Sequence, residues 1–210
     1  SRSSAASDVY KRQNHNIFNI DYLGYASDLL KLEVFKNTYQ KYHHINIDIS
    51  DLANLKKAIL RSDPDQIYHL AAESHVDRSI DAPFNFIKSN VIGTFNLLEA
   101  SNKHFNKLSE DRKKQFKFIH ISTDEVFGTL KNDGKFNETS NYRPNSPYSA
   151  TKASSDHLVR AWFRSYSLPT ITTNCSNNYG PYQFPEKLIP LTIFKAINGQ
   201  NIPVYGNGEN

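Results

Sequence analysis

The residues with the clearest capacity for chemistry are a tyrosine and a lysine four positions apart, Tyr148 and Lys152. Ser146 and Pro147 precede them and are typical of a helix start, with serine as the N-cap and proline at the first helical position. The residues up to about Tyr166 favour a helix, so the phenol and the ammonium would share one helix face. A nearby cation lowers the pKa of a tyrosine, which could then accept a hydroxyl proton while hydride leaves the same carbon for a nicotinamide. The alternative is an exposed tyrosine and lysine on an amphipathic helix.

A second polar group, Thr123, Asp124 and Glu125, follows an apolar run from Phe116 to Ser122 that predicts a buried strand. Ligands of open α/β sheets bind outside the carboxyl ends of the strands. Neighbouring carboxyl groups in different environments can divide into a protonated acid and an ionised base. By itself the triplet would also suit a solvated loop, but together with the tyrosine–lysine pair it predicts a site that moves protons and a hydride.

These two groups and their neighbours resemble the dTDP-glucose 4,6-dehydratases, a family of the extended short-chain dehydrogenase/reductase superfamily. The resemblance is carried by residues 120–128 (HISTDEVFG) and residues 146–152 (SPYSATK). The Tyr-x-x-x-Lys pair is common to the superfamily, whereas the Thr-Asp-Glu triplet is the mark of the dehydratases. The sugar-nucleotide epimerases of the superfamily usually lack the Asp-Glu pair at this place. Phe127 departs from the tyrosine that the family has at its position.

The resemblance covers residues 16–210 and implies an α/β fold with a doubly wound, Rossmann-like, mostly parallel sheet. It implies an NAD-binding domain over residues 14–180 and the start of a sugar-nucleotide-binding subdomain over residues 181–210. Residues 1–13 are small and polar, then basic, and we expect a non-native or disordered leader there. A Rossmann unit has a strand and a glycine-rich turn before the strand that ends in its acid, and no such glycine set precedes Asp21. We therefore expect a fragment that lacks the first strand, the glycine loop and the C-terminal part.

The reaction that the resemblance implies is that of a lyase, the NAD-dependent removal of water from dTDP-glucose to give dTDP-4-keto-6-deoxyglucose. Tyr148, helped by Lys152, would deprotonate the 4-hydroxyl as hydride passes to NAD. Glu125 would remove the 5-hydrogen, Asp124 would protonate the departing 6-hydroxyl, and Thr123 would hold the 4-oxygen, before hydride returns to carbon 6.

The implied cofactor is NAD. Asp21 ends a predicted strand at the place where a Rossmann fold carries an acid for the ribose hydroxyls, although an acid can also simply close a strand. Ala71 and Ala72 follow another predicted strand, and their small side chains suit either close approach of the cofactor or helix–sheet packing. By resemblance, the NAD contacts are Asp21, Tyr22, Leu23, Gly24, Asp48, Ile49, Leu70, Ala71, Ala72, Glu73, Ser74, Ser89, Tyr148, Lys152 and Asn178, with Asn90 near the ring site. The substrate contacts implied in the same way are Ser74, Thr123, Asn177, Lys187, Leu188, Pro203, Val204 and Tyr205.

Two alternatives stay open at this point. A sugar-nucleotide epimerase, or a dehydratase of a UDP- or GDP-sugar, would keep the tyrosine and lysine but depend less on Asp124 and Glu125. A chain without a glycine loop could also be an inactive fragment, or at most a binding module.

Composition excludes several other classes. The net charge of +4, from 25 basic and 21 acidic side chains without a basic block, does not indicate a nucleic-acid partner. Cys175 is the one cysteine, which fits a reducing cytoplasm, and no apolar run reaches membrane-spanning length. His75 has no cluster of ligands around it, so no metal site is expected. By resemblance we expect a homodimer through helices over residues 82–102 and 147–167, although core packing would explain their apolar stripes equally well.

Overall fold

The computed structural model describes residues 15–24, 27, 33–34, 37–130, 134–180 and 183–204. The expected leader and Tyr205, an expected substrate contact, lie outside these ranges. The described strands are β1 (Ile17–Ile20), β2 (Tyr42–Ile45), β3 (Gln66–His69), β4 (Lys117–Thr123) and β5 (Thr170–Cys175). Every pairing among them is parallel, and helices alternate with the strands along the chain, so the predicted α/β fold is confirmed.

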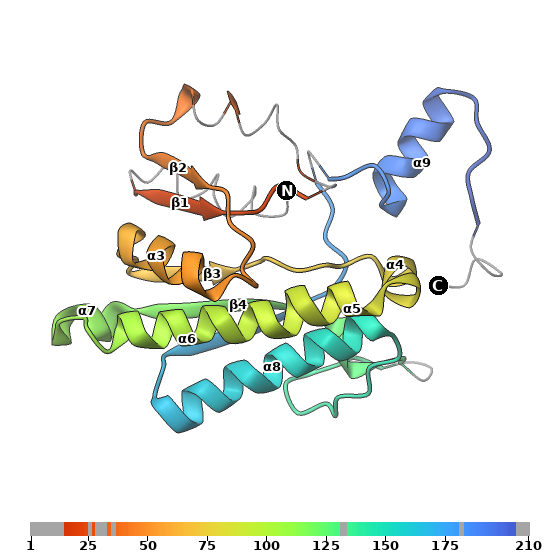
Figure 1. Cartoon of the computed structure of the whole chain (residues 1–210). Coiled ribbons are helices and arrows are strands. Elements are labelled where there is room, and N and C mark those ends of the chain that lie inside the picture. Colours follow the sequence, from red (N-terminus) through yellow and green to blue (C-terminus); the bar gives the residue numbers. More distant parts are fainter. Residues whose placement is uncertain are drawn as a thin grey trace.

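Helices form a layer in front of the sheet that contains β4 (Figure 1). Helices α6 and α8 lie side by side across β4, and both contribute to the same apolar core. The structure gives bounds for the following helices, in chain order: α3 (Leu52–Ser62), α4 (Val76–Asp81), α5 (Pro83–Phe86), the π-helix η1 (Ile87–Ile92), α6 (Gly93–Phe105), α7 (Glu110–Gln115), the 3₁₀ helix η2 (Asp124–Phe127), α8 (Pro147–Tyr166) and α9 (Leu188–Ile197).

The long helix expected over residues 82–102 is interrupted and ends later, at Phe105. Its middle turn widens into the π-helix η1, and the hydrogen-bonding pattern around Asn90 gives a reason. The Asn90 carbonyl accepts hydrogen bonds from Thr94 Oγ1 at 2.5 Å and from Ser155 Oγ, on α8, at 2.6 Å. Hydroxyl donors that insert into a helical ladder displace backbone partners, and single π turns are frequent at functional sites.

The apolar core lies between β3, β4 and the helices α3, α6 and α8. Strand β4 alternates its side chains, so that Phe118, His120 and Ser122 are buried on one face. The largest completely buried apolar side chains are Leu55, Phe86, Leu98, Phe116, Phe118, Val126, Val159 and Leu168. This core holds β4 and α8 against each other, which matters because both elements carry predicted site residues.

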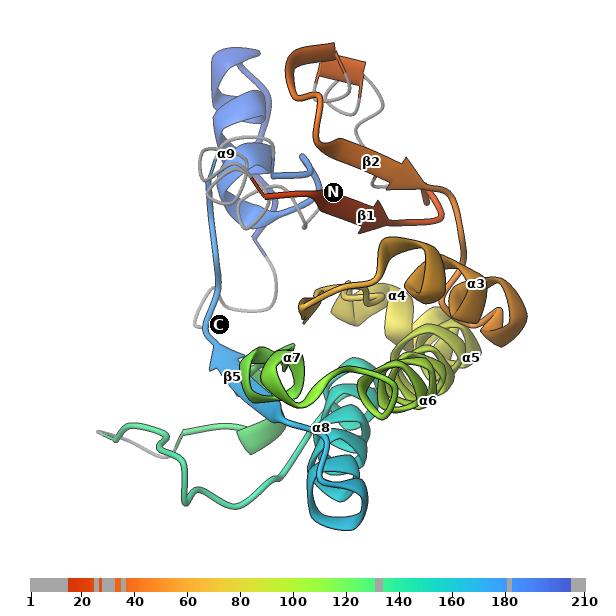
Figure 2. The same cartoon turned by 90° about the vertical axis from the view of Figure 1, so that its left-hand side faces the viewer.

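The described strands form two separate sheets, one of β1 and β2 and one ordered β3-β4-β5. Figure 2 shows the β1–β2 pair apart from β5. In the doubly wound order 3-2-1-4-5-6, the first strand lies between the second and the fourth. If β1 and β3 take those two places, one additional parallel strand between them would join the two sheets. The central strand that the sequence predicts to be missing would take this place between β1 and β3.

Candidate active site

Helix α8 buries Tyr148 and Lys152. The helix begins where the sequence predicts, because Ser146 and Ser149 form a reciprocal capping box and Pro147 occupies the first turn. Tyr148 is 7% exposed and Lys152 is 4% exposed, which contradicts the alternative of an exposed amphipathic face. Burying an ammonium group costs free energy unless it is paired or hydrogen-bonded, so a completely buried lysine needs partners. The Lys152 ammonium donates one hydrogen bond to the carbonyl oxygen of Ile121, in β4, at 2.8 Å.

The Thr123-Asp124-Glu125 triplet lies at the carboxyl end of β4, where η2 begins. Thr123 is the N-cap of this 3₁₀ helix: its Oγ1 accepts from the Glu125 N–H at 3.3 Å and donates to Asp124 Oδ1 at 3.3 Å. The Thr123 hydroxyl thus contacts the Asp124 side chain and the Glu125 backbone in a local turn that directly follows a buried strand.

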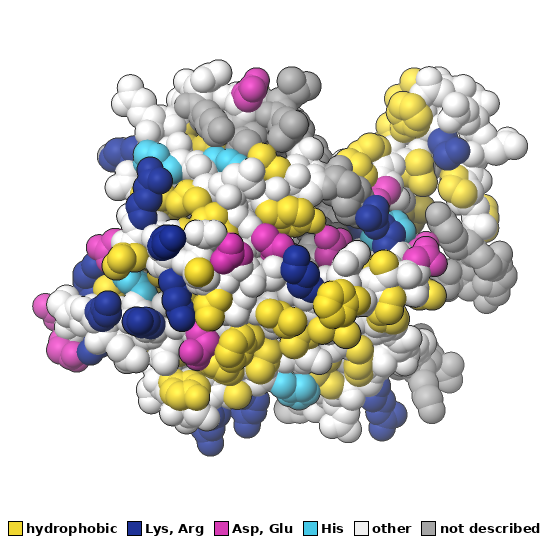
Figure 3. Space-filling view, in the orientation of Figure 1, with side chains coloured by type: hydrophobic (Ala, Val, Ile, Leu, Met, Phe, Trp, Pro, Cys, Tyr) yellow, Lys and Arg dark blue, Asp and Glu magenta, His cyan; other side chains and the backbone are white. Residues whose placement is uncertain are grey.

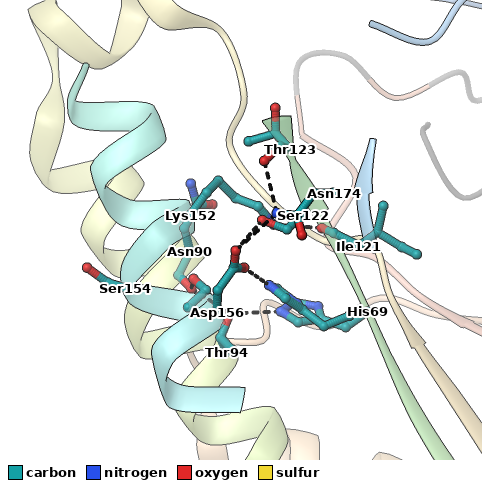
Figure 4. A network of polar contacts seen from close by, with 12 residues as sticks. His69, Asn90, Thr94, Ile121, Ser122, Thr123, Lys152, Ser154, Asp156 and Asn174 are labelled. Atoms are coloured by element: carbon teal, nitrogen blue, oxygen red, sulfur yellow. Dashed lines mark hydrogen bonds and ion pairs between the residues drawn. The ribbon is translucent and has the colours of Figure 1, made fainter. Parts of the chain in front are cut away.

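The Lys152–Ile121 hydrogen bond brings the two predicted groups together. Ile121 is two residues before Thr123 on the same strand, so the lysine on α8 reaches the strand end that carries the acids. Figure 4 shows Lys152 extending from α8 towards Ile121 and Thr123. The Tyr148 ring packs edge-on against Phe86, with ring centroids 6.3 Å apart.

Asn90 connects this region to the segment that leaves β3. Its side-chain oxygen Oδ1 accepts a hydrogen bond from the Glu73 N–H at 2.8 Å, and its amide nitrogen Nδ2 donates one to the Glu73 carbonyl at 3.0 Å. The same amide nitrogen donates to Thr151 Oγ1 at 3.0 Å, between Tyr148 and Lys152 along α8. Asn90 is 1% exposed, whereas its neighbour Ser89, predicted as a cofactor contact, is only partly buried.

The residues predicted for the nucleoside end of the cofactor follow β1 and β2. Asp21 comes directly after β1, and its Oδ1 accepts from the Leu23 N–H at 2.9 Å. The Tyr22 hydroxyl donates to Glu73 Oε1 at 3.3 Å, which links the segments leaving β1 and β3. Burial, and then the charge of Glu73, raises the pKa of the Tyr22 phenol.

Asp48 and Ile49, predicted for the adenine side, have different surroundings. The Asp48 carboxylate accepts from the Ser50 N–H at 2.8 Å and from Lys88 Nζ at 3.1 Å. Partial burial would raise the pKa of Asp48, but these hydrogen bonds outweigh it and lower that pKa. Ile49 is 7% exposed and belongs to the apolar core, where its side chain packs closely on Gly93.

The residues after β3 and β5 complete the predicted set. Ala71 packs against the apolar core. The carbonyl oxygen of Ser74 accepts a hydrogen bond from Lys187 Nζ at 3.4 Å. Lys187 and Ser74, both predicted substrate contacts, are therefore neighbours although 113 positions separate them. Asn177 and Asn178 follow β5 and are exposed, as are Leu188 and Val204, whereas Leu70, Ala72 and Pro203 are partly buried.

Sequence reasoning missed Asp156. It lies one helical turn after Lys152, is 4% exposed, and binds side chains of β4 and β5. The signal was present, since His120 and Ser122 alternate on β4 and a carboxylate four residues after a functional lysine lies on the same helix face.

Within the described residues, no three His, Cys, Asp or Glu side chains gather in a group that could hold a metal ion. In the same part of the chain, no helix has the length and apolar character needed to cross a membrane.

Comparisons with known proteins extend over nearly the whole chain. The family model described as GDP-mannose 4,6 dehydratase matches residues 9–210. A curated dTDP-glucose 4,6-dehydratase of Escherichia coli is 51% identical over 216 aligned residues, which cover 99% of this chain and 59% of the relative. A dTDP-glucose 4,6-dehydratase of Neisseria meningitidis is also 51% identical, over 98% of this chain and 58% of the relative. The chain thus spans about three fifths of the length of the curated relatives that it matches.

Solved structures show a similarity to the same kind of enzyme. The chain matches a dTDP-glucose 4,6-dehydratase of Streptomyces venezuelae, a double mutant with NAD and a second ligand bound, with a TM-score of 0.85 and 36% identity over 100% of this chain and 61% of that one. A Bacillus anthracis dTDP-glucose 4,6-dehydratase in complex with NAD matches with a TM-score of 0.82 and 37% sequence identity. This match covers 98% of this chain and 60% of that one. A UDP-glucuronic acid 4-epimerase of Bacillus cereus matches with a TM-score of 0.80 and 28% sequence identity. This match covers 96% of this chain and 61% of that one. The two curated relatives are dTDP-glucose 4,6-dehydratases, and the chain itself belongs to the GDP-mannose 4,6 dehydratase family.

Proposed function

We propose that this chain supplies the catalytic residues and part of the NAD site of a dTDP-glucose 4,6-dehydratase, a lyase that forms dTDP-4-keto-6-deoxyglucose. The observation that carries the proposal is the hydrogen bond from Lys152 Nζ to the Ile121 carbonyl, which joins the tyrosine–lysine pair to the strand that ends in Thr-Asp-Glu. The similarity to curated dehydratases over 99% of the chain supports the same substrate.

Each catalytic side chain has one task in this proposal. Tyr148 takes the proton of the 4-hydroxyl, and it must be a phenolate to do so. The Lys152 ammonium favours this ionised form. NAD, when bound, supplies the acceptor and later the donor of one hydride. The resulting 4-ketone acidifies the hydrogen on carbon 5.

The elimination uses the two carboxyl groups of the triplet. Glu125 takes the proton from carbon 5, and Asp124 gives a proton to the departing 6-hydroxyl, which leaves as water. Thr123 holds the 4-oxygen by a hydrogen bond. After elimination Glu125 is therefore protonated and Asp124 is ionised. When hydride returns to carbon 6, carbon 5 needs a proton, and Glu125 would give its proton back there. Tyr148 keeps the proton of the former 4-hydroxyl, which must pass through solvent to Asp124 before the next turnover.

The described residues suit two parts of NAD. Asp21, at the end of β1, offers a carboxylate to the ribose hydroxyls, and Ala71 and Ala72 leave room for the nicotinamide side. The pyrophosphate is held in Rossmann folds by a glycine-rich turn at a helix N-terminus, and this sequence contains no such glycine set before Asp21. The chain's own residues therefore account for the two ends of NAD and not for its centre.

We assign the sugar nucleotide to Thr123 at the end of β4 and to residues that follow β3 and β5. Ser74 and Thr123 would contact the sugar, and Asn177, Lys187 and Leu188 the nucleotide side. The contact between Lys187 and Ser74 supports one shared site for these residues. Pro203, Val204 and Tyr205 complete the proposed base pocket. We place the protein in the cytoplasm, which its single cysteine, Cys175, favours.

A second copy of the chain is the partner that we propose for the α5–α8 face. Figure 3 shows hydrophobic side chains gathered across this face. Its large exposed members are Phe84, Ile87, Ile92 and Phe95 before and on α6, and Phe163 and Tyr166 on α8. Trp162 joins the two helices, since its ring is 5.7 Å from Phe95 and 5.4 Å from Tyr166, centroid to centroid. Exposed apolar patches of this kind mark protein interfaces.

A sugar-nucleotide epimerase is the second candidate, because the Bacillus cereus epimerase shares the fold at 28% identity. The two functions differ in what they ask of Asp124 and Glu125. An epimerase needs no acid and base for elimination, whereas a dehydratase fails without them. The triplet at the end of β4 therefore favours the dehydratase.

A full-length chimera allows the test, with residues 16–210 of this chain replacing the segment that they match in the Escherichia coli relative. Glu125→Gln should lower product formation by about 10²-fold or more, because a general base is lost, while reduced nicotinamide still forms from dTDP-glucose. Glu138→Gln, at an exposed position, is the matched control and should leave both rates unchanged. Undiminished dehydration by Glu125→Gln would overturn the proposed function.

A further inference from the structure

A buried carboxylate, Asp156, accepts hydrogen bonds from three other parts of the chain. The donors are His120 Nε2 at 3.0 Å and Ser122 Oγ at 2.8 Å on β4, the Tyr142 hydroxyl at 2.8 Å before α8, and Asn174 Nδ2 at 3.4 Å on β5. Figure 4 shows Asp156 on α8 with Ser122, Asn174 and the strand end at Thr123 around it. The carboxylate thus joins α8 to β4, to β5 and to the segment that carries Tyr142.

The charge on this network rests on Asp156. Burial would raise the pKa of the carboxyl, but the hydrogen bonds from His120, Ser122 and Tyr142 outweigh it and lower that pKa. Burial lowers the pKa of His120, so the imidazole is neutral near neutral pH and donates its Nε2 proton. Burial, and then the charge of Asp156, raises the pKa of Tyr142, which therefore remains a phenol donor.

Three titratable groups, Lys152, His69 and His157, face this network from the elements around it. The ring of His157, an exposed residue of α8, lies 5.1 Å from the Tyr142 ring, centroid to centroid. Lys152 lies one turn before Asp156 on α8, and His69 on β3 has its ring 5.1 Å from that of His120. Burial, followed by the charges of His120 and Lys152, lowers the pKa of His69 well below its ordinary value. The buried charges around the network are therefore one carboxylate and the Lys152 ammonium.

The network surrounds the contact that assembles the proposed site. The donors His120 and Ser122 flank Ile121, whose carbonyl accepts from Lys152 Nζ at 2.8 Å. Asn174 also donates to the Thr123 carbonyl at 3.1 Å, so the strand end is held from β5 as well. If Asp156 released these donors, α8 could shift along β4 and Lys152 would lose its alignment.

We propose that Asp156 is a positioning residue for the dehydratase reaction proposed above. By holding β4, β5 and the Tyr142 segment on α8, it fixes the Ile121 carbonyl that holds the Lys152 ammonium, and so sets where this ammonium lies relative to Tyr148 and Thr123. It contacts neither substrate nor cofactor in this role. The inference rests on the proposed function for its effect on turnover, but not for its effect on the tyrosine.

Two properties separate positioning from a mere contribution to folding. The first is the rate of the initial oxidation, measured as reduced nicotinamide formed in a single turnover of NAD-loaded chimera. Asp156→Asn keeps the side-chain size and loses the charge, and we expect this rate to fall by about tenfold to a hundredfold while the KM for dTDP-glucose changes less than about threefold. Asp111→Asn, an exposed aspartate on α7 with a side chain 89% exposed, should leave the rate unchanged.

The second property is the pKa of Tyr148, read by ultraviolet titration as the difference between each protein and its Tyr148→Phe counterpart. Loss of a negative charge alone would lower this pKa, because the phenolate is then less repelled. Displacement of the Lys152 ammonium would raise it, because the phenolate loses a cation. We expect Asp156→Asn to raise the pKa of Tyr148. Ser122→Ala keeps the charge of Asp156 and removes one hydrogen-bond donor, and we expect it to raise the pKa of Tyr148 less.

The outcomes distinguish this inference from the proposed function. An unchanged or lowered Tyr148 pKa in Asp156→Asn, or an unchanged oxidation rate per NAD-loaded molecule beside a lower melting temperature, would overturn the positioning role. A wild-type chimera that forms no 4-keto-6-deoxy product would overturn the proposed function, while the Tyr148 titration would still test Asp156. Ser122→Ala keeps the test valid where Asp156→Asn does not fold.

Discussion

At the scale of single residues, the buried histidines connect stability to pH. His69 is 2% exposed, and its Nε2 lies 2.8 Å from Thr94 Oγ1. Its pKa in the folded chain is well below its ordinary value, first because of burial and then because of His120 and Lys152. An unfolded histidine has a pKa of about 6.5, so below that pH the unfolded chain binds a proton that the folded chain does not. The stabilising contribution is therefore complete above about pH 6.5 and is lost as the pH falls.

We expect the free energy of unfolding to decrease between about pH 7 and about pH 5, by up to about 1.4 kcal/mol per pH unit for each such histidine. His69→Gln should reduce this slope, and urea unfolding at several pH values measures it. His43→Gln, at an exposed position on β2, is the control and should keep the wild-type slope. Equal slopes in wild type and His69→Gln would show that His69 does not carry the effect.

At the scale of elements, the turn that ends η2 fixes how the chain leaves the acidic triplet. Gly128 has φ of +87°, and a Cβ added there would lie 2.4 Å from the Arg143 carbonyl oxygen. The Arg143 N–H also donates to the Val126 carbonyl at 2.9 Å, so the two segments are in direct contact. Only glycine suits this backbone conformation and this close approach.

Gly128→Ala should therefore destabilise the chain by about 1–3 kcal/mol, and more where the Arg143 segment must move. Gly134→Ala is the matched control, because the added Cβ would meet only Leu130 Cδ2 at an ordinary 3.7 Å. Urea unfolding of both variants gives the difference directly. Equal stability of the two variants would refute the account of this turn.

At the scale of the whole molecule, cofactor binding depends on how the two sheets are joined. Among the described strands, β1 pairs only with β2, and β3 pairs only with β4. We expect calorimetry to detect NAD binding by a chimera in which a strand and a glycine-rich turn precede residue 16, and much weaker or no binding by the 210-residue chain alone. Equal affinities would mean that the ends of NAD suffice and that the glycine turn is dispensable.

The proposed dimer is tested at the same scale. Phe163 lies in the apolar face of α5–α8 and is 48% exposed, and Phe194 on α9 lies outside it and is 56% exposed. Phe163→Glu places a charge in the interface and should turn a dimeric chimera into a monomer, because an unpaired buried charge is costly. Phe194→Glu should leave the sedimentation coefficient unchanged. A dimer that survives Phe163→Glu would place the interface elsewhere.

Local patterns sufficed for several parts of the site. Ser146 and Pro147 set the start of α8, and the predicted end near Tyr166 is its observed end. The buried strand predicted over residues 116–122 is β4 at residues 117–123, one position later. The predicted dehydratase family is supported by the curated relatives, and the α/β class is confirmed. These features follow from neighbouring residues, because caps, strand patterns and short motifs depend on local spacing.

Other parts required contacts between distant segments. The long helix over residues 82–102 was predicted as continuous, and it widens at Asn90 because hydroxyls of Thr94 and Ser155 bind its carbonyl. No spacing rule relates Asn90 to Glu73, or Lys187 to Ser74, because these pairs form only when the strands are already side by side.

By itself the sequence determined which residues carry chemistry, which family they resemble and which helices and strands bear them. The tertiary structure alone decided that Lys152 is buried against the Ile121 carbonyl, and that Asp156 gathers donors from β4, β5 and the Tyr142 segment. The physical reason is that a buried charge is tolerated only where folding supplies its hydrogen-bond partners, and those partners come from residues far apart in the chain.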